Sequence, residues 1–363
     1  MSPPPLALEI HYQIMGHITQ HTDLSALSLC CRSFRDEAQR KLFRDPGNTD
    51  LTFVRQGKFF EVIIASPGRL APMVKSYNLK TFVMDGPRAE QRRNAAAAAL
   101  RLMCNLTTLS IDDRQSRCIY MTALLDCPFE LHTLAVVRTG GRYTPNVDLL
   151  LFDFLRKQPS LRILTISGEK ADPVITQSLR DDPTWCPNLV SLTVEASLMD
   201  IFLAKHRPIQ HLDWYGPTSK ELGQSSHLSS LKYLSCSSYL MANVSFLQTF
   251  QRMTSLILLD VYIHDADGEA LVEQLYLHKN IPQLRYLILS GLVDIFATRE
   301  PGPEDVRAAF ELCPTLVYID MSMATSVYDD LDTFDRFYPP DARGEMAKIV
   351  LRKDDVYAWK KAF

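Results

Sequence analysis

The chain has 363 residues, enough for two or three domains with cores of their own. Hydrophobic residues make up 46% and charged residues 22%, as is usual for soluble proteins. A net charge of −3 argues against a protein that holds nucleic acid through phosphate contacts, because such proteins carry a basic excess. No apolar run approaches the ~20 residues of a membrane span, and the start lacks the features of a signal peptide. We therefore expect an intracellular protein, cytoplasmic or nuclear, without membrane or nucleic-acid partners, whose eight scattered cysteines are reduced.

Two or three short amphipathic helices are predicted between Pro5 and Phe43. Apolar residues recur there at about one helical turn. They are Leu6, Ile10, Ile14 and Ile18, followed by Leu24, Leu27, Cys31, Phe34 and Ala38. His21–Asp23 is the polar break between these helices, and Asp23 is the predicted N-cap of a helix that begins at Leu24. A segment of about forty residues cannot bury enough surface to fold alone, so these helices should dock on another part.

The order of residues in this segment resembles a known family. Leu6–Ile10 and Asp23–Arg35 are similar to the F-box, the helical module by which substrate receptors attach to the Skp adaptor of SCF ubiquitin ligases. Ala7 stands where that family usually has proline, shortly after Pro3–Pro5. The resemblance implies an adaptor contact at Leu6, Ala7, Ile10, Ile14, Leu24, Leu27, Leu29, Cys31 and Phe34. Cys31 and Phe34 could equally be internal core residues.

A six-residue pattern, L-x-x-L-x-(L/I/V), then recurs through the chain. Its first positions are Val74, Leu106, Leu131, Leu161, Leu189, Ile209, Leu231, Leu256, Leu284 and Leu316. Successive copies are 20 residues (Leu189 to Ile209) to 32 residues (Val74 to Leu106) apart. Such periods are typical of leucine-rich repeats with insertions, in which each copy supplies one strand.

Helices are predicted between several of these strands. They are Arg92–Met103, which holds five consecutive alanines, and Asp148–Lys157, Val244–Arg252, Gly268–His278 and Glu304–Leu312. Strand followed by helix at a repeating period predicts an α/β solenoid with parallel strands on the concave side and helices on the convex side. Lys58–Leu79 is also similar to the first connection and strand of F-box proteins with leucine-rich repeats.

Three regions are expected. Residues 1–45 form the F-box-like helical module, residues 46–323 the leucine-rich-repeat solenoid of about ten irregular repeats, and residues 324–363 an acidic loop with a capping segment. Turn formers at Asp45–Asn48 mark the first boundary. Glu345–Lys361 carries apolar residues that could lie over the exposed final repeat, which a solenoid needs.

The predicted binding surface is the concave face. Side chains alternate along a strand, so the third, fifth and seventh positions of each copy share that face. In the second half this gives tyrosines and aspartates, which favour a partner segment with Lys or Arg and some apolar character. The candidates are His211, Asp213, Tyr215, Tyr233, Asp260, Tyr262, Tyr286, Tyr318 and Asp320. Alternatively the tyrosines only cover the sheet. Trp214 falls on an inward position and is expected in the core.

Motifs for catalysis and for metal or cofactor binding are weak. No glycine-rich nucleotide loop or hydrolase elbow occurs. His17 and His21 have a metal-ligand spacing but span a predicted helix end. His264, Asp265 and Asp267 could form a metal or acid–base cluster, although polar turn residues are expected there. We predict no catalytic residue, no metal and no cofactor.

The resemblance implies a substrate-recognition subunit of an SCF ubiquitin ligase, with the Skp adaptor and cullin as partners and an unidentified protein substrate on the repeats. The chain would perform no chemistry itself. One alternative is a leucine-rich-repeat scaffold for protein interactions without a role in ubiquitin transfer. Another is an enzyme or enzyme activator, for which His264 with Asp265 and Asp267 is the best cluster.

Overall fold

The structure is a computed structural model that describes residues 8–46, 53–81, 87–113, 119–138, 145–167, 185–203, 207–215, 226–237, 252–266, 281, 283–293, 302–324 and 332–362. These residues form a mixed α/β protein with 12 strands, most of them parallel to their neighbours. The chain divides into two compact units, Met1–Leu161 and Arg162–Phe363. No described helix is long and apolar enough to cross a membrane.

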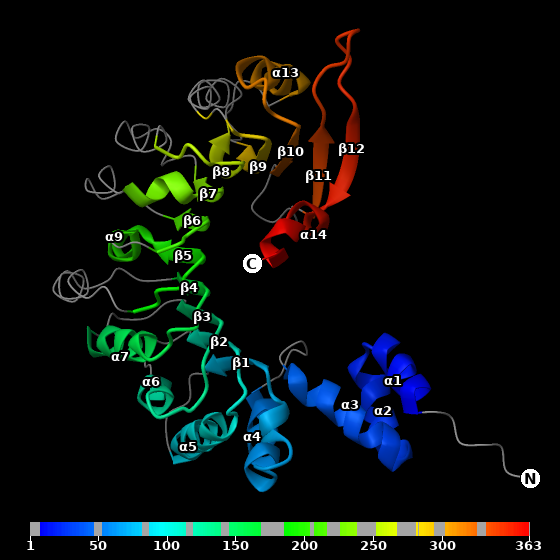
Figure 1. Cartoon of the computed structure of the whole chain (residues 1–363), viewed down its shortest axis with the longest axis vertical. Coiled ribbons are helices and arrows are strands. Elements are labelled where there is room, and N and C mark those ends of the chain that lie inside the picture. The colour runs from blue at the N-terminus through cyan, green and yellow to red at the C-terminus, as the bar shows by residue number, and fades with distance from the viewer. Residues whose placement is uncertain are drawn as a thin grey trace, which may run out of the picture. The chain divides into compact units, whose positions relative to one another are not determined.

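Unit 1 begins with four helices (Figure 1). They are α1 (Leu8–His17), α2 (His21–Cys30), α3 (Arg32–Arg44) and α4 (Phe53–Ala65). Met15, Leu24 and Ala38 form a buried cluster, one residue from each of the first three helices. The ammonium group of Lys41 on α3 donates hydrogen bonds to the carbonyls of Met15 and Ile18, which closes the C-terminal end of α1. Three short helices thus share one small core.

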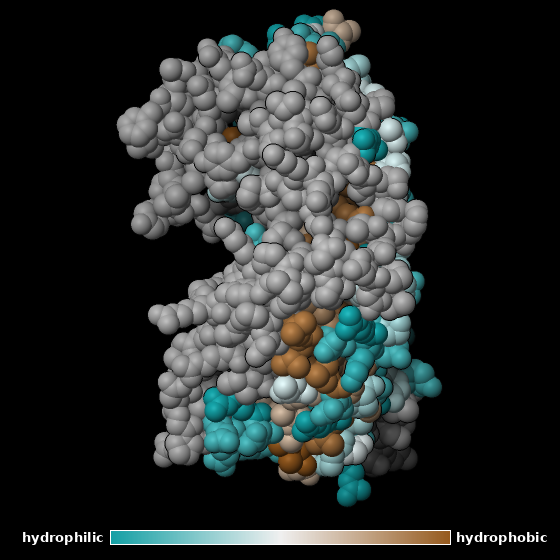
Figure 2. All heavy atoms as spheres, turned by 90° about the vertical axis from the view of Figure 1, so that its left-hand side faces the viewer, coloured by the Kyte–Doolittle hydropathy of each residue, from teal (hydrophilic) through white to brown (hydrophobic). Residues whose placement is uncertain are grey.

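The rest of unit 1 alternates strands and helices. The strands β1 (Ser76–Thr81), β2 (Thr108–Asp113) and β3 (Thr133–Arg138) pair in parallel. The helices are α5 (Pro87–Leu102), α6 (Ile119–Leu124) and α7 (Pro145–Arg156), with the short 3-10 helix η2 (Ala71–Met73) before β1. Figure 2 faces the helix-bearing side, where hydrophobic and hydrophilic side chains of the described residues lie side by side.

Unit 2 continues with seven parallel strands among its described residues. They are β4 (Ile163–Ser167), β5 (Ser191–Glu195), β6 (His211–Tyr215), β7 (Tyr233–Ser237), β8 (Leu258–Ala266), β9 (Tyr286–Val293) and β10 (Tyr318–Ala324). Between these strands the described helices are α9 (Ala196–Leu203), η4 (Ser226–Ser230) and α13 (Pro303–Leu312). Pro303 stands in the first turn of α13, where its missing N–H costs nothing.

The end of unit 2 changes direction. The strands β11 (Thr333–Phe337) and β12 (Lys348–Arg352) pair antiparallel, β11 with β10 and β12 with β11. The chain then forms α14 (Lys353–Val356) and η5 (Ala358–Ala362). In Figure 1, α9 and α14 lie on opposite sides of the unit 2 strands. We call Lys353–Ala362 the C-terminal segment.

All ten copies of the repeated pattern form strands, and each strand begins two residues after the first position of its copy. The patterned apolar residues are buried, except for half-buried Met321, and Trp214 is fully buried as expected. The predicted helices Arg92–Met103, Asp148–Lys157 and Glu304–Leu312 correspond to α5, α7 and α13. Gly268–His278, and Val244–Arg252 apart from Arg252, lie outside the described residues. The sequence therefore predicted the α/β class and the positions of these strands.

Candidate functional site

Three rows of side chains run across one face of unit 2. Strand register aligns the third, fifth and seventh positions of successive copies. The first row is Ser191, His211, Tyr233, Leu258, Tyr286 and Tyr318. The second is Thr193, Asp213, Ser235, Asp260, Ile288 and Asp320. The third includes Ser237, Tyr262, Ser290 and Ser322, with Tyr215 on β6 at the same position of its copy. Eight of the nine predicted residues have described side chains on this face, and that of Tyr215 lies outside the described ones.

The C-terminal segment packs on this face. Val356 joins Leu258, Ile288 and Phe334 in a buried apolar cluster. Trp359 stacks on Tyr233 with ring centroids 5.2 Å apart and meets the His211 ring edge-on at 5.1 Å. The prediction placed these apolar residues over the final repeat; instead β11 and β12 extend the sheet there, and the segment covers β6–β9. The physical reason is that the hairpin satisfies the open edge of β10, which leaves the next residues free to turn onto the face.

Lys360 lies between two carboxylates of the second row. Its ammonium nitrogen is 3.6 Å from Oδ1 of Asp213 and 3.9 Å from Oδ2 of Asp260. Asp213 also accepts hydrogen bonds from Nε2 of His211 (3.0 Å) and from the hydroxyl of Thr193 (2.9 Å). Burial tends to raise the pKa of Asp213, but the hydrogen bond from His211 and the Lys360 charge outweigh it and lower that pKa. Asp213 is therefore held as a carboxylate.

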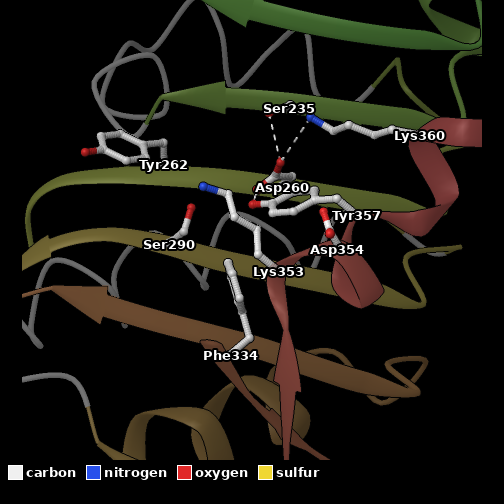
Figure 3. Close-up of a pocket in the computed structure, with 9 residues that line it drawn as sticks. All are labelled: Ser235, Asp260, Tyr262, Ser290, Phe334, Lys353, Asp354, Tyr357 and Lys360. Carbon is white, nitrogen blue, oxygen red and sulfur yellow. Dashed lines mark hydrogen bonds and ion pairs between the residues drawn. The ribbon is translucent and has the colours of Figure 1, made fainter. Parts of the chain in front are cut away.

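Asp260 has the opposite balance. It accepts hydrogen bonds from the hydroxyls of Ser235 (3.0 Å) and Tyr357 (3.3 Å), as Figure 3 shows for Ser235 together with the Lys360 ion pair. Burial nevertheless raises its pKa from 3.8 to about 6, against the lowering effects of Lys360 and Ser235. Two carboxylates that share one lysine thus differ in their affinity for protons.

This difference predicts a pH dependence of stability. Below about pH 4 Asp260 is protonated both folded and unfolded, whereas between about pH 4 and 6 the folded chain holds the proton that the unfolded chain releases. Its contribution to stability should therefore fall as pH rises through this window, by on the order of 2 kcal/mol. Urea unfolding of the wild type and Asp260→Asn at several pH values, with one curve subtracted from the other, measures this contribution.

The control is Asp354→Asn, which removes an exposed carboxylate of the same segment and should leave the wild-type slope in place. The opposite result would be that the wild type becomes more stable than Asp260→Asn as the pH rises. It would show that attraction to Lys360 stabilises the charged carboxylate by more than its burial costs.

Asp320, the third predicted aspartate, is already paired with a basic residue of this chain. Its side chain is completely buried and accepts two hydrogen bonds from Arg336 on β11, at 2.6 and 2.7 Å. The guanidinium also lies 3.7 Å from the centre of the Tyr318 ring, which in turn stacks on Tyr286. These predicted residues of the last strands therefore contact an internal arginine.

One cluster has the donor order of a hydrolase triad. The hydroxyl of Ser191 is 2.7 Å from Nδ1 of His211, and Nε2 of His211 is 3.0 Å from Asp213. A carboxylate only accepts, so Nε2 of His211 donates to Asp213. All three residues are at most 8% exposed, and the Ser191 N–H donates to the carbonyl of Arg162. An acyl substrate has no access to this serine, so the cluster serves as a buried polar ladder.

A cavity of about 410 Å³ adjoins the C-terminal segment. Figure 3 shows Lys353, Tyr357 and Lys360 entering it from the segment, with Tyr262 and Ser290 on the strands opposite. Its size falls in the range of small-ligand sites. Among the described residues no group of three side chains suited to a metal ion occurs.

The residues predicted to contact an adaptor divide into two sets. Ile10, Ile14, Leu29 and Cys31 are exposed, whereas Leu24 is only 3% exposed and belongs to the core of α1–α3. Leu27 and Phe34 are half-buried against that core. Leu24 is thus corrected to a core residue, because α2 turns this side toward Met15 and Ala38. Leu6 and Ala7 lie outside the described residues.

Sequence reasoning missed several contributors to these surfaces. Arg336, Lys353 and Lys360 were not singled out, although the acidic rows called for a basic partner and the last residues are rich in lysine. Tyr12, 50% exposed on α1, was also missed. His17 ends α1 and His21 begins α2, so the pair spans a helix end as predicted. The N-cap of α2 is Gln20 and not the predicted Asp23, which lies in the first turn of that helix. The side chains of His264 and Asp265 on β8 and the whole of Asp267 lie outside the described residues.

Comparison with known proteins gives no further identification. No protein-family model matches the chain, and a search of curated proteins finds no significant match.

Proposed function

We propose that this chain is the substrate-recognition subunit of an SCF-type ubiquitin ligase. Helices α1–α3 would act as the F-box that binds the Skp adaptor, and the repeated strands as a leucine-rich-repeat solenoid that holds a protein substrate. The chain would act by proximity, raising the effective concentration of substrate lysines at a conjugating enzyme carried by the complex. The chain would remain in the cytoplasm or nucleus with the other subunits.

The observation that carries this proposal is an apolar surface on α1 and α2 that does not serve their own core. Leu29 is 80% exposed, and Ile10 and Ile14 are 43% and 44% exposed. Met15 and Leu24, on other sides of the same helices, already complete the internal cluster. Ile10 and Ile14 lie one turn apart on α1, and large apolar side chains left exposed beside a completed core favour a protein partner.

The test is a titration of the purified full chain against the Skp adaptor. Leu29→Asp and Ile14→Asp should each weaken binding at least tenfold, because each places a charge in an apolar contact without disturbing the core. The matched control for Ile14→Asp is Leu149→Asp on α7, which changes an apolar residue of similar exposure (46%) and should bind like the wild type.

Failure of the folded wild type to bind the adaptor would remove the ubiquitin-ligase role. The better account would then be a repeat scaffold for protein interactions, with the same face of unit 2 as its binding surface.

A further inference from the structure

The C-terminal segment presents the chemistry that the face of unit 2 calls for. Tyr357 and Trp359 are two residues apart and set their rings on the face, and Lys360 follows with its charge between Asp213 and Asp260. The sequence of the strands predicted a partner with a basic group and apolar character. The chain's own last residues meet that description.

The contacts of Trp359 and Lys360 are weaker than the ion pair that fixes the preceding strand β11 to β10. Lys360 is 3.6 and 3.9 Å from its two carboxylates, beyond the 2.7–2.9 Å typical of a charged hydrogen bond, and is 32% exposed. The Trp359 indole Nε1 is buried, and no acceptor among the described residues reaches it. An unsatisfied buried donor weakens the docking of this ring. By contrast, Arg336 binds Asp320 at 2.6 and 2.7 Å.

The segment is therefore held firmly at its N-terminal end and weakly at its C-terminal end. The firm anchor is the preceding β11–β12 hairpin, together with Phe334 and Val356 in the apolar cluster. The weakly held end is Trp359–Lys360, and Lys360 lines a cavity of about 410 Å³ that the segment leaves open. A longer ligand could make the same contacts and fill this space as well.

We propose that β6–β9 recognise a segment of a partner protein in which two aromatic residues are separated by one residue and followed directly by Lys or Arg. The C-terminal segment then occupies this site as an intramolecular competitor. The proposal rests on that part of the proposed function which assigns this face to a substrate. Tyr233 and His211 receive the second ring, and the two aspartates receive the cation. An arginine could reach both carboxylates with its planar fork.

The strength of this competition can be measured as the difference in peptide affinity between the wild type and a variant whose own segment binds weakly. A tethered segment acts at an effective concentration of about millimolar, so a free peptide with the same contacts binds the wild type only weakly. The probe is a fluorescent peptide that copies residues 353–363, titrated against full-length chains by anisotropy. Trp359→Ala/Lys360→Ala should bind it at least tenfold more tightly than the wild type does.

Three controls define the site. Asp355→Ala changes an exposed residue of the same segment and should bind the peptide like the wild type. Adding Tyr233→Ala to the double variant should abolish binding, as should replacing the peptide's tryptophan with alanine. If the double variant does not fold, Lys360→Ala alone takes its place, because it keeps both aromatic rings on the face. This single variant should bind the peptide several-fold more tightly than the wild type does.

Hydrogen exchange of the wild type gives an independent measurement. Peptide at millimolar concentration should speed exchange of the amides of Lys353–Ala362 and leave those of β12 unchanged. A folded Lys360→Ala chain that binds no better than the wild type, with no change in exchange, would make the segment a fixed part of the core and overturn the proposal. Dimers of the wild type in light scattering that dissociate on Trp359→Ala would also overturn it, because the occupant would then be a second copy.

Adaptor binding is measured on α1–α3 and peptide binding on β6–β9, so the two proposals fail separately. A chain that binds the peptide but no adaptor keeps the recognition site and loses the ubiquitin-ligase role. A chain that binds the adaptor but shows no competition keeps the role and loses this site.

Discussion

Replacing Arg336 by methionine is expected to lower the free energy of unfolding by about 3–5 kcal/mol, because it leaves a buried charge without its partner. Asp320 is completely buried and takes both of its hydrogen bonds from this guanidinium. Methionine keeps much of the apolar length that lies over Tyr318, so the loss reports the charge and not the packing. Urea unfolding followed by circular dichroism measures it.

A double-mutant cycle supplies the control. Arg336→Met/Asp320→Leu should recover most of the lost stability, because an apolar pair replaces a buried ion pair at little net cost. The loss in Arg336→Met should also shrink at acid pH, where the isolated carboxyl takes up a proton. A loss below about 1 kcal/mol would mean that water or another group solvates Asp320 once the arginine is gone.

The strands could be predicted because the repeated leucine pattern directly indicates which side chains are buried. Leucine-like residues alternate with polar ones at a period of two, and a strand is the structure that buries one set and leaves the other on the face. Tyr233, Tyr286 and Tyr318 could be assigned to one row for the same reason, since a register slip by one residue would expose buried leucines.

The role of Leu24 could not be taken from the F-box resemblance alone. Matching residues to a motif does not say which side of a helix faces the core, and α2 is apolar on more than one side. At 3.6 residues per turn Leu24 and Leu29 point about 140° apart, while Leu27 lies about 60° from Leu24. This geometry separates buried Leu24 from exposed Leu29, although only the position of α3 decides which side is inside.

The position at which the C-terminal segment docks could not be predicted from its local sequence pattern. Val356, Tyr357 and Trp359 indicate that the segment covers something apolar, but their target depends on where the β11–β12 hairpin ends. That position follows from the pairing of β11 with β10 and from the Arg336–Asp320 contact, which joins residues 16 apart in sequence. A single sequence thus identifies the apolar residues that must pack on something, but it does not identify the surface on which they pack.

Gly291→Ala is expected to destabilise unit 2 by at least about 3 kcal/mol, because two strands have no room for one more methyl group. Gly291 on β9 pairs with Ile263 on β8, just before the register between the two strands shifts. A Cβ built on Gly291 would lie 2.0 Å from the carbonyl oxygen of Ile263, so the backbones would have to separate. The same strands carry Asp260 and Tyr286, and the candidate site should therefore loosen with them.

Gly57→Ala is the matched control for this prediction. Gly57 lies inside α4, nothing is within 4 Å of the added methyl group, and alanine is the better helix former by about 1 kcal/mol. The same substitution should thus raise stability at one position and lower it at the other, as urea unfolding of the two variants would show. Hydrogen exchange should place the loss in Gly291→Ala at β8 and β9. Wild-type stability in that variant would mean that the two strands lie farther apart in solution than the 2.0 Å approach implies.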